Sequence, residues 1–450
     1  MDSALACPPV AEVFDRVCDA VRASMEETQT PGVSVGLLHD GEEHVAGFGV
    51  TSTENPLEVT PETLFQIGSI TKTFTGTAAM RLVERGALDL DAPARTYLPD
   101  LKLSDENVAA RVTTRHLLTH TGGWIGDYFD DYGSGDDALA RMCGALAMLP
   151  QLTPLGEVWS YNNAGFYLAG RVIEVVTRKP YETALQELVL DPLGLENTFF
   201  FADDVMTRRF AVGHHRSEDG PPTVARPWGI GRAHHAAGGI ASSVSDLLRY
   251  ARFHMGDGEG VLQRSTLDEM QRTQFESGSI FEFVGITWSI SERTGARLVG
   301  HGGGTNGQIS LFFFAPEHEL AFAVFTNHQR GSEVGLAARG PALEAIGAKE
   351  RERTPLKVDA DEYLGTYASA LIQVELKRED GELVLVTTPK GGFPRKDSPP
   401  MPAPPPSTVA FYDTDRIFAT EGPPGEAEFL RATDGSIAWF RVGGRVMARV

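Results

Sequence analysis

The chain has 450 residues, of which 42% are hydrophobic and 22% are charged, and its formal net charge is −21 at pH 7. This length exceeds that of one ordinary domain, and the composition is that of a folded globular protein. Nucleic acids and anionic membrane surfaces repel a protein of this charge, so we expect neither as a partner. The three cysteines stand at no metal-ligand or disulfide-framework spacing, and we interpret them as structural thiols.

The N-terminal segment has neither a basic start nor an apolar core of signal-peptide length, and no run in the sequence is long enough to cross a bilayer. We therefore expect a cytoplasmic protein, or a secreted one if a signal peptide has been removed. Apolar side chains from Val10 to Met25 recur at helical spacing and predict an amphipathic helix. A β-hairpin is predicted next, with strands near Val33–Leu38 and His44–Val50 around an Asp-Gly turn.

Helical patterns dominate from about residue 71 to residue 198. A run of strands follows between residues 286 and 328, and a helical pattern then extends from about Val334 to Lys349. Strands at both ends of a helical region indicate one mixed sheet, built by both ends of this part of the chain and packed against helices. We predict that residues 1–350 form this first domain.

The character of the sequence changes after a charged linker at residues 349–362. The segments beyond it are short, roughly alternating in polarity and divided by Gly and Asp turns, which is typical of a small antiparallel barrel or sandwich. Residues 351–450 are therefore predicted to form a second, β-structured domain that alters substrate range or association. The Pro-rich tract Gly391–Thr408 is predicted to be a mobile loop within it.

A serine and a lysine stand three positions apart in "FQIGSITKTFTG", at the predicted start of a helix. Ser69 and Lys72 would project from one side of the first turn, close enough to touch. A serine hydroxyl needs a neighbouring base and a site for the developing oxyanion before it becomes a useful nucleophile. Lys72 can be that base, and backbone N–H groups at the helix start can hold the oxyanion. A helix cap followed by a surface lysine is the alternative interpretation.

Two further motifs carry polar groups that suit the same chemistry. Tyr161 and Asn163 precede a predicted helix, where a phenol can move a proton and an amide can hold Lys72 or a substrate. A turn with a half-buried tyrosine is the alternative. The stretch "HGGGTNG" begins at His301, and its glycines indicate that another backbone approaches this strand closely. It can offer an N–H group to an acyl oxyanion, or it is simply a glycine-rich turn.

Taken together, Ser69-Ile70-Thr71-Lys72, Tyr161-Asn162-Asn163 and His301-Gly302-Gly303 resemble the ordered motifs of the penicillin-recognising serine hydrolases. This family includes class C β-lactamases, DD-peptidases, D-aminopeptidases and family VIII esterases. The stretches at 113–123, 236–253 and 325–328 are similar to the family as well. The resemblance covers about residues 10 to 348. It implies an α/β (α+β) fold in which helices lie on both faces of an antiparallel sheet, with a helical subdomain, followed here by a lipocalin-like β-domain.

The resemblance also implies roles for these residues. Ser69 would be the nucleophile, and Lys72 with Tyr161 would form the base assembly. Asn163 would orient Lys72 and the acyl side chain. His301 would line the cleft and assist the leaving group or water. The N–H groups of Ser69 and Gly304 would form the oxyanion hole, and Gly303 would lie with Gly304 against the substrate.

One departure from class C β-lactamases concerns the third motif, which is Lys-Thr-Gly in those enzymes and His301-Gly302-Gly303 here. A histidine is not a dependable cation for gripping a carboxylate. We therefore expect poor turnover of penicillins and cephalosporins, unless another cation such as Arg226 or Arg232 reaches the carboxylate.

The predicted function is that of a serine hydrolase acting through a Ser69 acyl-enzyme on small esters or peptide amides, including D-amino-acid peptides. The alternatives are a penicillin-binding-protein-type thioesterase or peptide cyclase, a β-lactamase, and a non-catalytic protein that binds acyl groups or assembles with partners. A homo-oligomer is compatible with each. We expect no cofactor and no metal, since the histidines lack cysteine or carboxylate ligands at zinc-like spacing. Those histidines are His116, His120, His214, His215, His234 and His235.

Overall fold

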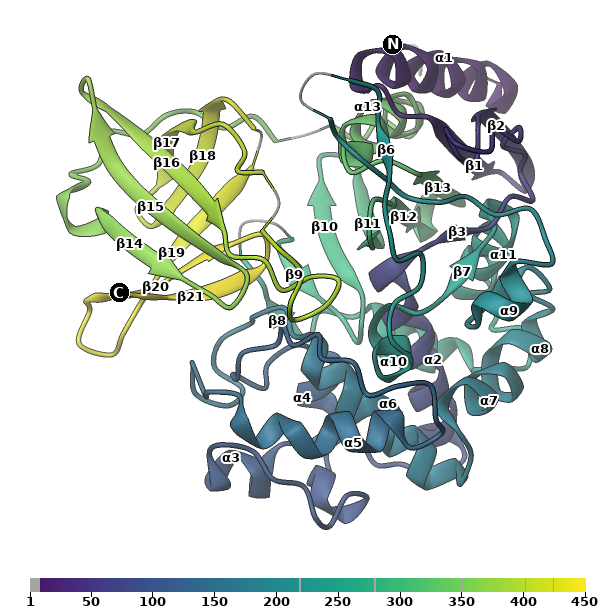
Figure 1. Cartoon of the computed structure of the whole chain (residues 1–450), viewed down its shortest axis with the longest axis horizontal. Helices are drawn as coiled ribbons and strands as arrows, with labels where there is room; N and C mark the ends of the chain where they lie inside the picture. Colours follow the sequence, from purple (N-terminus) through teal and green to yellow (C-terminus); the bar gives the residue numbers. More distant parts are fainter. Residues whose placement is uncertain (1–8, 218–219, 279–280, 350, 401, 424) are drawn as a thin grey trace, which may run out of the picture.

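The computed structural model describes residues 9–217, 220–278, 281–349, 351–400, 402–423 and 425–450. An α/β domain occupies most of the molecule, and a β-barrel lies beside it (Figure 1). The eight-stranded sheet has the order β2-β1-β13-β12-β11-β10-β9-β8. Its strands are β1 Gly32–His39, β2 Glu42–Gly49, β8 Phe275–Glu276, β9 Phe283–Val284, β10 Ser289–Arg293, β11 Ala296–Gly304, β12 Ile309–Ala315 and β13 Leu320–Thr326.

Every pairing in this sheet is antiparallel, so the α/β fold with an antiparallel sheet is confirmed and the mixed sheet is wrong. The N-terminal hairpin joins the C-terminal strands through β1 and β13, with Val33 opposite Thr326. A strand that enters the sheet beside β13 in the opposite direction needs no crossover helix. The remaining short strands are β3 Phe65–Gln66, β4 Thr198–Phe199, β5 His214–His215, β6 Thr223–Val224 and β7 Ala241–Ser242.

Helices cover both faces of the sheet (Figure 1). On one face α1 and α13 pack against each other and bury side chains such as Val17 and Val334 with Phe322. On the other face α2 and α11 belong to the larger core, which continues into the helical region. The helices are α1 Val10–Thr28, α2 Thr71–Glu84, α3 Glu106–Arg111, α4 Thr114–Leu118, α5 Ala138–Ala145, α6 Asn163–Thr177, α7 Tyr181–Leu185, α8 Asp191–Leu193, α9 Ala202–Val205, α10 His235–Gly238, α11 Val244–Met255, α12 Arg264–Gln271 and α13 Gly331–Ala345.

The C-terminal strands close into an eight-stranded antiparallel barrel, which confirms the predicted β-domain. Its interior contains an aromatic cluster in which Tyr363 and Phe440 both contact Phe429. The domain boundary at residues 350 and 351 stays a prediction. The barrel strands are β14 Gly365–Ala368, β15 Ile372–Glu379, β16 Glu382–Pro389, β17 Ser407–Asp413, β18 Arg416–Glu421, β19 Glu426–Arg431, β20 Ile437–Val442 and β21 Arg445–Arg449.

Two of the three cysteines lie in the described part of the chain. Cys18 is buried, Cys143 is half-buried, and both are free thiols. Cys7 lies outside the described residues. Among the described helices, none combines the length and the apolar character that a membrane span requires.

Candidate active site

Ser69 lies in a 3-10 turn, Gly68–Ile70, that leads directly into α2. Ser69 was predicted to lie in the first turn of an α-helix, whereas the structure places it in the 3-10 turn that precedes this helix. Gly68 has a φ of 51°, and a Cβ at this position would lie 2.6 Å from the backbone nitrogen of Gly304. Only glycine therefore lets the Ser69 turn approach β11 this closely.

Lys72 is buried, and its Nζ lies 3.1 Å from Ser69 Oγ. The same nitrogen donates a hydrogen bond to the Ala237 carbonyl oxygen at 2.6 Å. Burial lowers the pKa of Lys72 well below its ordinary value, and the positive charge of Arg445 lowers it further, while Asp127 opposes the shift. An amine with a lowered pKa keeps a lone pair that can accept the Ser69 proton.

Tyr161 lies just before α6, and Lys72 Nζ is 4.9 Å from the centroid of its ring. Its hydroxyl is buried and has no hydrogen-bond partner of normal geometry in the described part of the chain. Burial raises the pKa of Tyr161, whereas the charge of Arg445 and the nearby Ser69 hydroxyl lower it. An unpartnered hydroxyl beside the serine and the lysine is placed to exchange a proton with a reacting group.

His120 packs against Tyr161. The two rings stack with centroids 4.5 Å apart. Nδ1 of His120 accepts a hydrogen bond from the backbone N–H of Asn162 at 2.9 Å, and its carbonyl oxygen accepts one from Ser160 N at 3.0 Å. Burial lowers its pKa well below the ordinary value, so the ring is neutral at neutral pH.

Asn163 is the first residue of α6, and its side chain differs in its contacts from the prediction. Nδ2 donates a hydrogen bond to Asp127 Oδ1 at 2.8 Å. Among the described residues, no hydrogen bond joins Asn163 to Lys72. The amide instead lines the cavity that opens on Ser69, from where it can face a substrate.

His301 lies on β11, buried behind Tyr161, with ring centroids 6.1 Å apart. Its Nδ1 lies 2.6 Å from the Gly302 carbonyl oxygen. Burial and the charge of Lys72 lower the pKa of His301 to about 4. The residue therefore provides no cation at neutral pH. It lines a small space shared with His120 and Trp159 and is not among the described residues around the main cavity.

The glycines of the third motif allow β11 to run against the backbone beside Ser69. A Cβ on Gly303 would lie 1.8 Å from the carbonyl oxygen of Ile67. That oxygen already accepts a hydrogen bond from Ser310 Oγ at 2.9 Å. Any larger residue here would push β11 away from the serine, because the conflicting atom belongs to the backbone.

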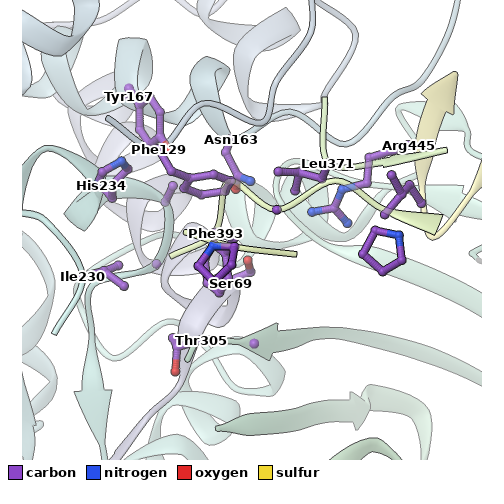
Figure 2. Close-up of a pocket in the computed structure, with 17 residues that line it drawn as sticks. Ser69, Phe129, Asn163, Tyr167, Ile230, His234, Thr305, Leu371, Phe393 and Arg445 are labelled. Carbon is purple, nitrogen blue, oxygen red and sulfur yellow. The ribbon is translucent and has the colours of Figure 1, made fainter. Parts of the chain in front are cut away.

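A cavity of about 330 Å³ opens on Ser69 (Figure 2). Its walls are mostly apolar and come from both domains. The α/β domain contributes Phe129, Asn163, Tyr167, Ile230, His234, Ala237, Gly238, Gly304 and Thr305. The barrel contributes Leu371, Ile372, Pro389, Gly391, Phe393, Pro399 and Arg445. The Pro-rich tract between β16 and β17 thus forms part of the wall, and Phe393 meets Phe129 edge to face at 5.0 Å.

Among the described residues that line this cavity, Arg445 is the permanent cation, and no sequence motif marks it. It begins β21 and points toward the site in Figure 2. Its Nε donates a hydrogen bond to Asp127 Oδ2 at 3.1 Å, and its guanidinium carbon is 4.6 Å from the centroid of the Tyr161 ring. The only local signal is a Gly-Gly hairpin turn, which does not predict a contact with residues more than 280 positions away.

The two arginines proposed from the sequence are engaged elsewhere. Arg226 is an exposed residue that pairs with Glu54. Arg232 pairs with Glu182 at 3.0 Å and with Asp136 at 2.7 Å. Neither belongs to the described lining of the Ser69 cavity.

Residues 17–345 match the family model described as Beta-lactamase. The chain belongs to the beta-lactamase family. This membership confirms the resemblance drawn from the three motifs. The protein is 32% identical over 319 residues to Penicillin-binding protein 4 of Amycolatopsis lactamdurans, which covers 69% of this chain and 83% of that protein.

Solved structures extend the likeness of this beta-lactamase-family protein to its barrel. The crystal structure of SurE superposes with a TM-score of 0.76 at 25% identity, covering 98% of this chain and 100% of that one. SurE has also been crystallised with D-Leu, and that structure superposes with a TM-score of 0.75. The D-amino acid amidase of Ochrobactrum anthropi, complexed with L-phenylalanine amide, has a TM-score of 0.63 at 25% identity over 74% of this chain and 98% of its own.

Proposed function

We propose that this protein hydrolyses the amide or ester bond that joins an acyl group to a C-terminal, apolar D-amino acid, through an acyl-enzyme on Ser69. Family membership supports a serine hydrolase in general terms. The observation that carries the proposal is the combination of Ser69 and Lys72, 3.1 Å apart, with a largely apolar cavity that opens on Ser69 and is lined by the cation Arg445. A protein that only binds acyl groups has no need for the buried amine beside the serine.

The chemistry begins with proton transfer from Ser69 Oγ to the neutral Lys72 amine as Oγ attacks the substrate carbonyl carbon. The backbone N–H groups of Ser69 and Gly304 are proposed to hold the oxyanion of the tetrahedral intermediate. Its collapse breaks the bond to the leaving group. Tyr161 gives its proton to that leaving group and regains one from Lys72. Water then attacks the ester on Ser69 through the same steps in reverse and releases the acid.

The choice of leaving group follows from the cavity. A C-terminal amino acid has a carboxylate, which Arg445 can bind, and an apolar side chain, which the wall of Phe129, Leu371 and Phe393 can bury. The crystallisation of SurE with D-Leu supports a ligand of this kind and configuration, because that chain matches this one over its whole length. The D-configuration, the leaving group and the predicted homo-oligomer stay proposals.

The test compares the release of leucine from N-acetyl-D-alanyl-D-leucine and its L-leucine diastereomer with the release of leucinamide from the D-leucinamide analogue. We expect kcat/KM to be highest for the D-leucine peptide. Loss of the carboxylate should lower kcat/KM roughly ten- to hundredfold, which is the size of one charged hydrogen bond. Ser69→Ala is the control for background hydrolysis. Equal rates for the acid and the amide would contradict carboxylate recognition, and equal rates for the two diastereomers would contradict the D-preference.

A further inference from the structure

The hairpin of β20, β21 and the turn between them is hydrogen-bonded to the segment of the α/β domain that carries Tyr161. Three consecutive residues of the α/β domain take part. Tyr161 N donates a hydrogen bond to the Gly444 carbonyl oxygen at 2.8 Å, and Ser160 Oγ accepts one from Val446 N at 3.2 Å. The Trp159 carbonyl oxygen accepts one from the Arg441 guanidinium at 2.6 Å. Gly444 has a φ of 75°, which favours glycine, and a Cβ at this position would lie 3.0 Å from the Trp159 ring, a tight contact. The barrel thus fixes the backbone from which Tyr161 projects.

The same turn brings a charge to the tyrosine. Arg445 follows Gly444 directly, and its guanidinium lies over the Tyr161 ring. Asp127 holds it there, with a side chain only 5% exposed, and also accepts the hydrogen bond from Asn163. One buried carboxylate therefore ties the arginine of the barrel to the first residue of α6.

The other groups around Tyr161 provide no lasting positive charge. His120, stacked on the ring, and His301, on β11, are both neutral at neutral pH because burial lowers their pKa values. Tyr167 on α6 is uncharged, and burial raises its pKa. Lys72 on α2 has a lowered pKa and alternates between its two forms during the reaction. Within the described chain, Arg445 is the permanent cation next to the tyrosine, and the Asp127 carboxylate is its ion-pair partner.

We propose that Arg445 is a positioning residue for Tyr161 and that its charge stabilises the phenolate formed while Tyr161 passes its proton to the leaving group, with Asp127 limiting this effect. The proposal rests on the acyl transfer by Ser69 proposed above. Class C enzymes have a lysine in the third motif, and here His301 replaces it. In this protein the positive charge is supplied by Arg445, which lies in the barrel near the C-terminus.

The two charges act on proton affinities in opposite directions. A cation favours the deprotonated form of both Tyr161 and Lys72, so removing Arg445 raises both pKa values. Removing the charge of Asp127 lowers both. The base must be deprotonated to take the Ser69 proton, so the acid limb of the kcat/KM profile moves with these pKa values.

The experiment measures kcat/KM against pH for p-nitrophenyl acetate, a neutral ester without a carboxylate, read at the isosbestic wavelength of the product. In Arg445→Met the acid limb should move up by about one to two pH units, and in Asp127→Asn it should move down. Arg445→Lys keeps the charge and should keep the limb near that of the parent. Arg449→Met removes another arginine of the same strand, whose guanidinium bonds Glu362 and Leu364, and should leave the limb unchanged.

The outcomes separate this proposal from the proposed function. The electrostatic role of Arg445 is overturned if the acid limb of the kcat/KM profile is unchanged in both Arg445→Met and Asp127→Asn. It is also overturned if the limb moves in the same direction in both variants. If Arg445→Met lowers only the turnover of the D-leucine peptide, the arginine is a carboxylate contact and nothing more. Hydrolysis that survives Ser69→Ala would instead overturn the acyl-enzyme. Arg445→Lys and Asp127→Asn keep the test decisive if the methionine variant does not fold.

Discussion

The two walls of the Ser69 cavity, one from the α/β domain and one from the barrel, differ in how well the sequence predicts their residues. The α/β domain brings Ser69, Lys72 and Tyr161 together from short motifs. The spacing of Ser69 and Lys72 predicts their contact, and the resemblance to a known family implies that Tyr161 joins them. The barrel contributes Arg445 and Phe393 from a hairpin and a loop without any motif. Arg445 and its partner Asp127 are 318 positions apart in the sequence. The reacting groups are thus visible in local sequence, whereas the charge and the apolar surface that surround them depend on how the domains pack.

Removal of the barrel should have the largest effect, because it eliminates one of the two walls. A chain that ends near Thr354 loses the contact of Gly444 with Tyr161 N, the charge of Arg445 and one wall of the cavity. We expect kcat/KM to fall by up to about 10⁴-fold even for p-nitrophenyl acetate, because proton transfer fails. The sequence predicted that the barrel alters substrate range or association. Loss of turnover for a small neutral ester would be a larger effect than that.

Circular dichroism and thermal unfolding accompany that assay. The α/β domain has its own core and should keep a cooperative unfolding transition. Near-parental turnover by a folded, truncated chain would show that the barrel does not position Tyr161. An unfolded chain, under conditions in which the parent is stable, would contradict the domain boundary.

Substitutions in the α/β wall come next in size. Lys72→Ala and Tyr161→Phe should each lower kcat by about 10² to 10³-fold, since both take part in the same proton transfers. The double variant should lose much less than the product of the two factors, because either change already disables the unit. Steady-state kinetics of the parent, the two single variants and the double variant measure this. Simple multiplication of the two losses would indicate that the groups act independently.

A substitution in the third motif should have a smaller effect, and it should raise kcat/KM rather than lower it. His301 is neutral at neutral pH because burial and Lys72 lower its pKa to about 4. His301→Lys adds a cation to β11, and we expect kcat/KM for nitrocefin to rise by roughly tenfold, about the size of one charge-assisted contact. Nitrocefin should be a poor substrate of the parent. If it is the best substrate of the unmodified protein, the assignment moves to a β-lactamase.

The smallest effect concerns the apolar part of the barrel wall. Phe393→Ala removes the edge-to-face contact with Phe129 and opens the cavity beside the leaving group. We expect KM for the D-leucine peptide to rise a few-fold, about 1 kcal/mol of lost contact, while kcat stays near the parental value. Phe201→Ala is the matched control, because Phe201 is 38% exposed and lies outside the described lining of this cavity. A fall in kcat alone would mean that Phe393 acts on the chemistry.

The sequence predicted those parts of the fold that rest on local periodicity. The N-terminal helix, the first hairpin and the run of strands between residues 286 and 328 lie where the apolar patterns place them. Periodicity led to a mixed sheet, whereas the family resemblance implied the antiparallel sheet that the structure has. Strand direction depends on which strands become neighbours, and periodicity does not reveal that. Asn163 was expected to bind Lys72, but Asp127 takes its amide hydrogen bond, and no pattern marked Asp127.

Covalent labelling of the nucleophile tests the central claim most directly, because a fluorophosphonate forms a stable phosphonate ester with an activated serine and releases fluoride. The protein is mixed with a fluorophosphonate, and its intact mass and its peptide map are recorded beside those of Ser69→Ala. We predict one adduct per chain, located on Ser69, and none on the alanine variant. Labelling of another residue, or equal labelling of the alanine variant, would contradict an acyl-enzyme on Ser69.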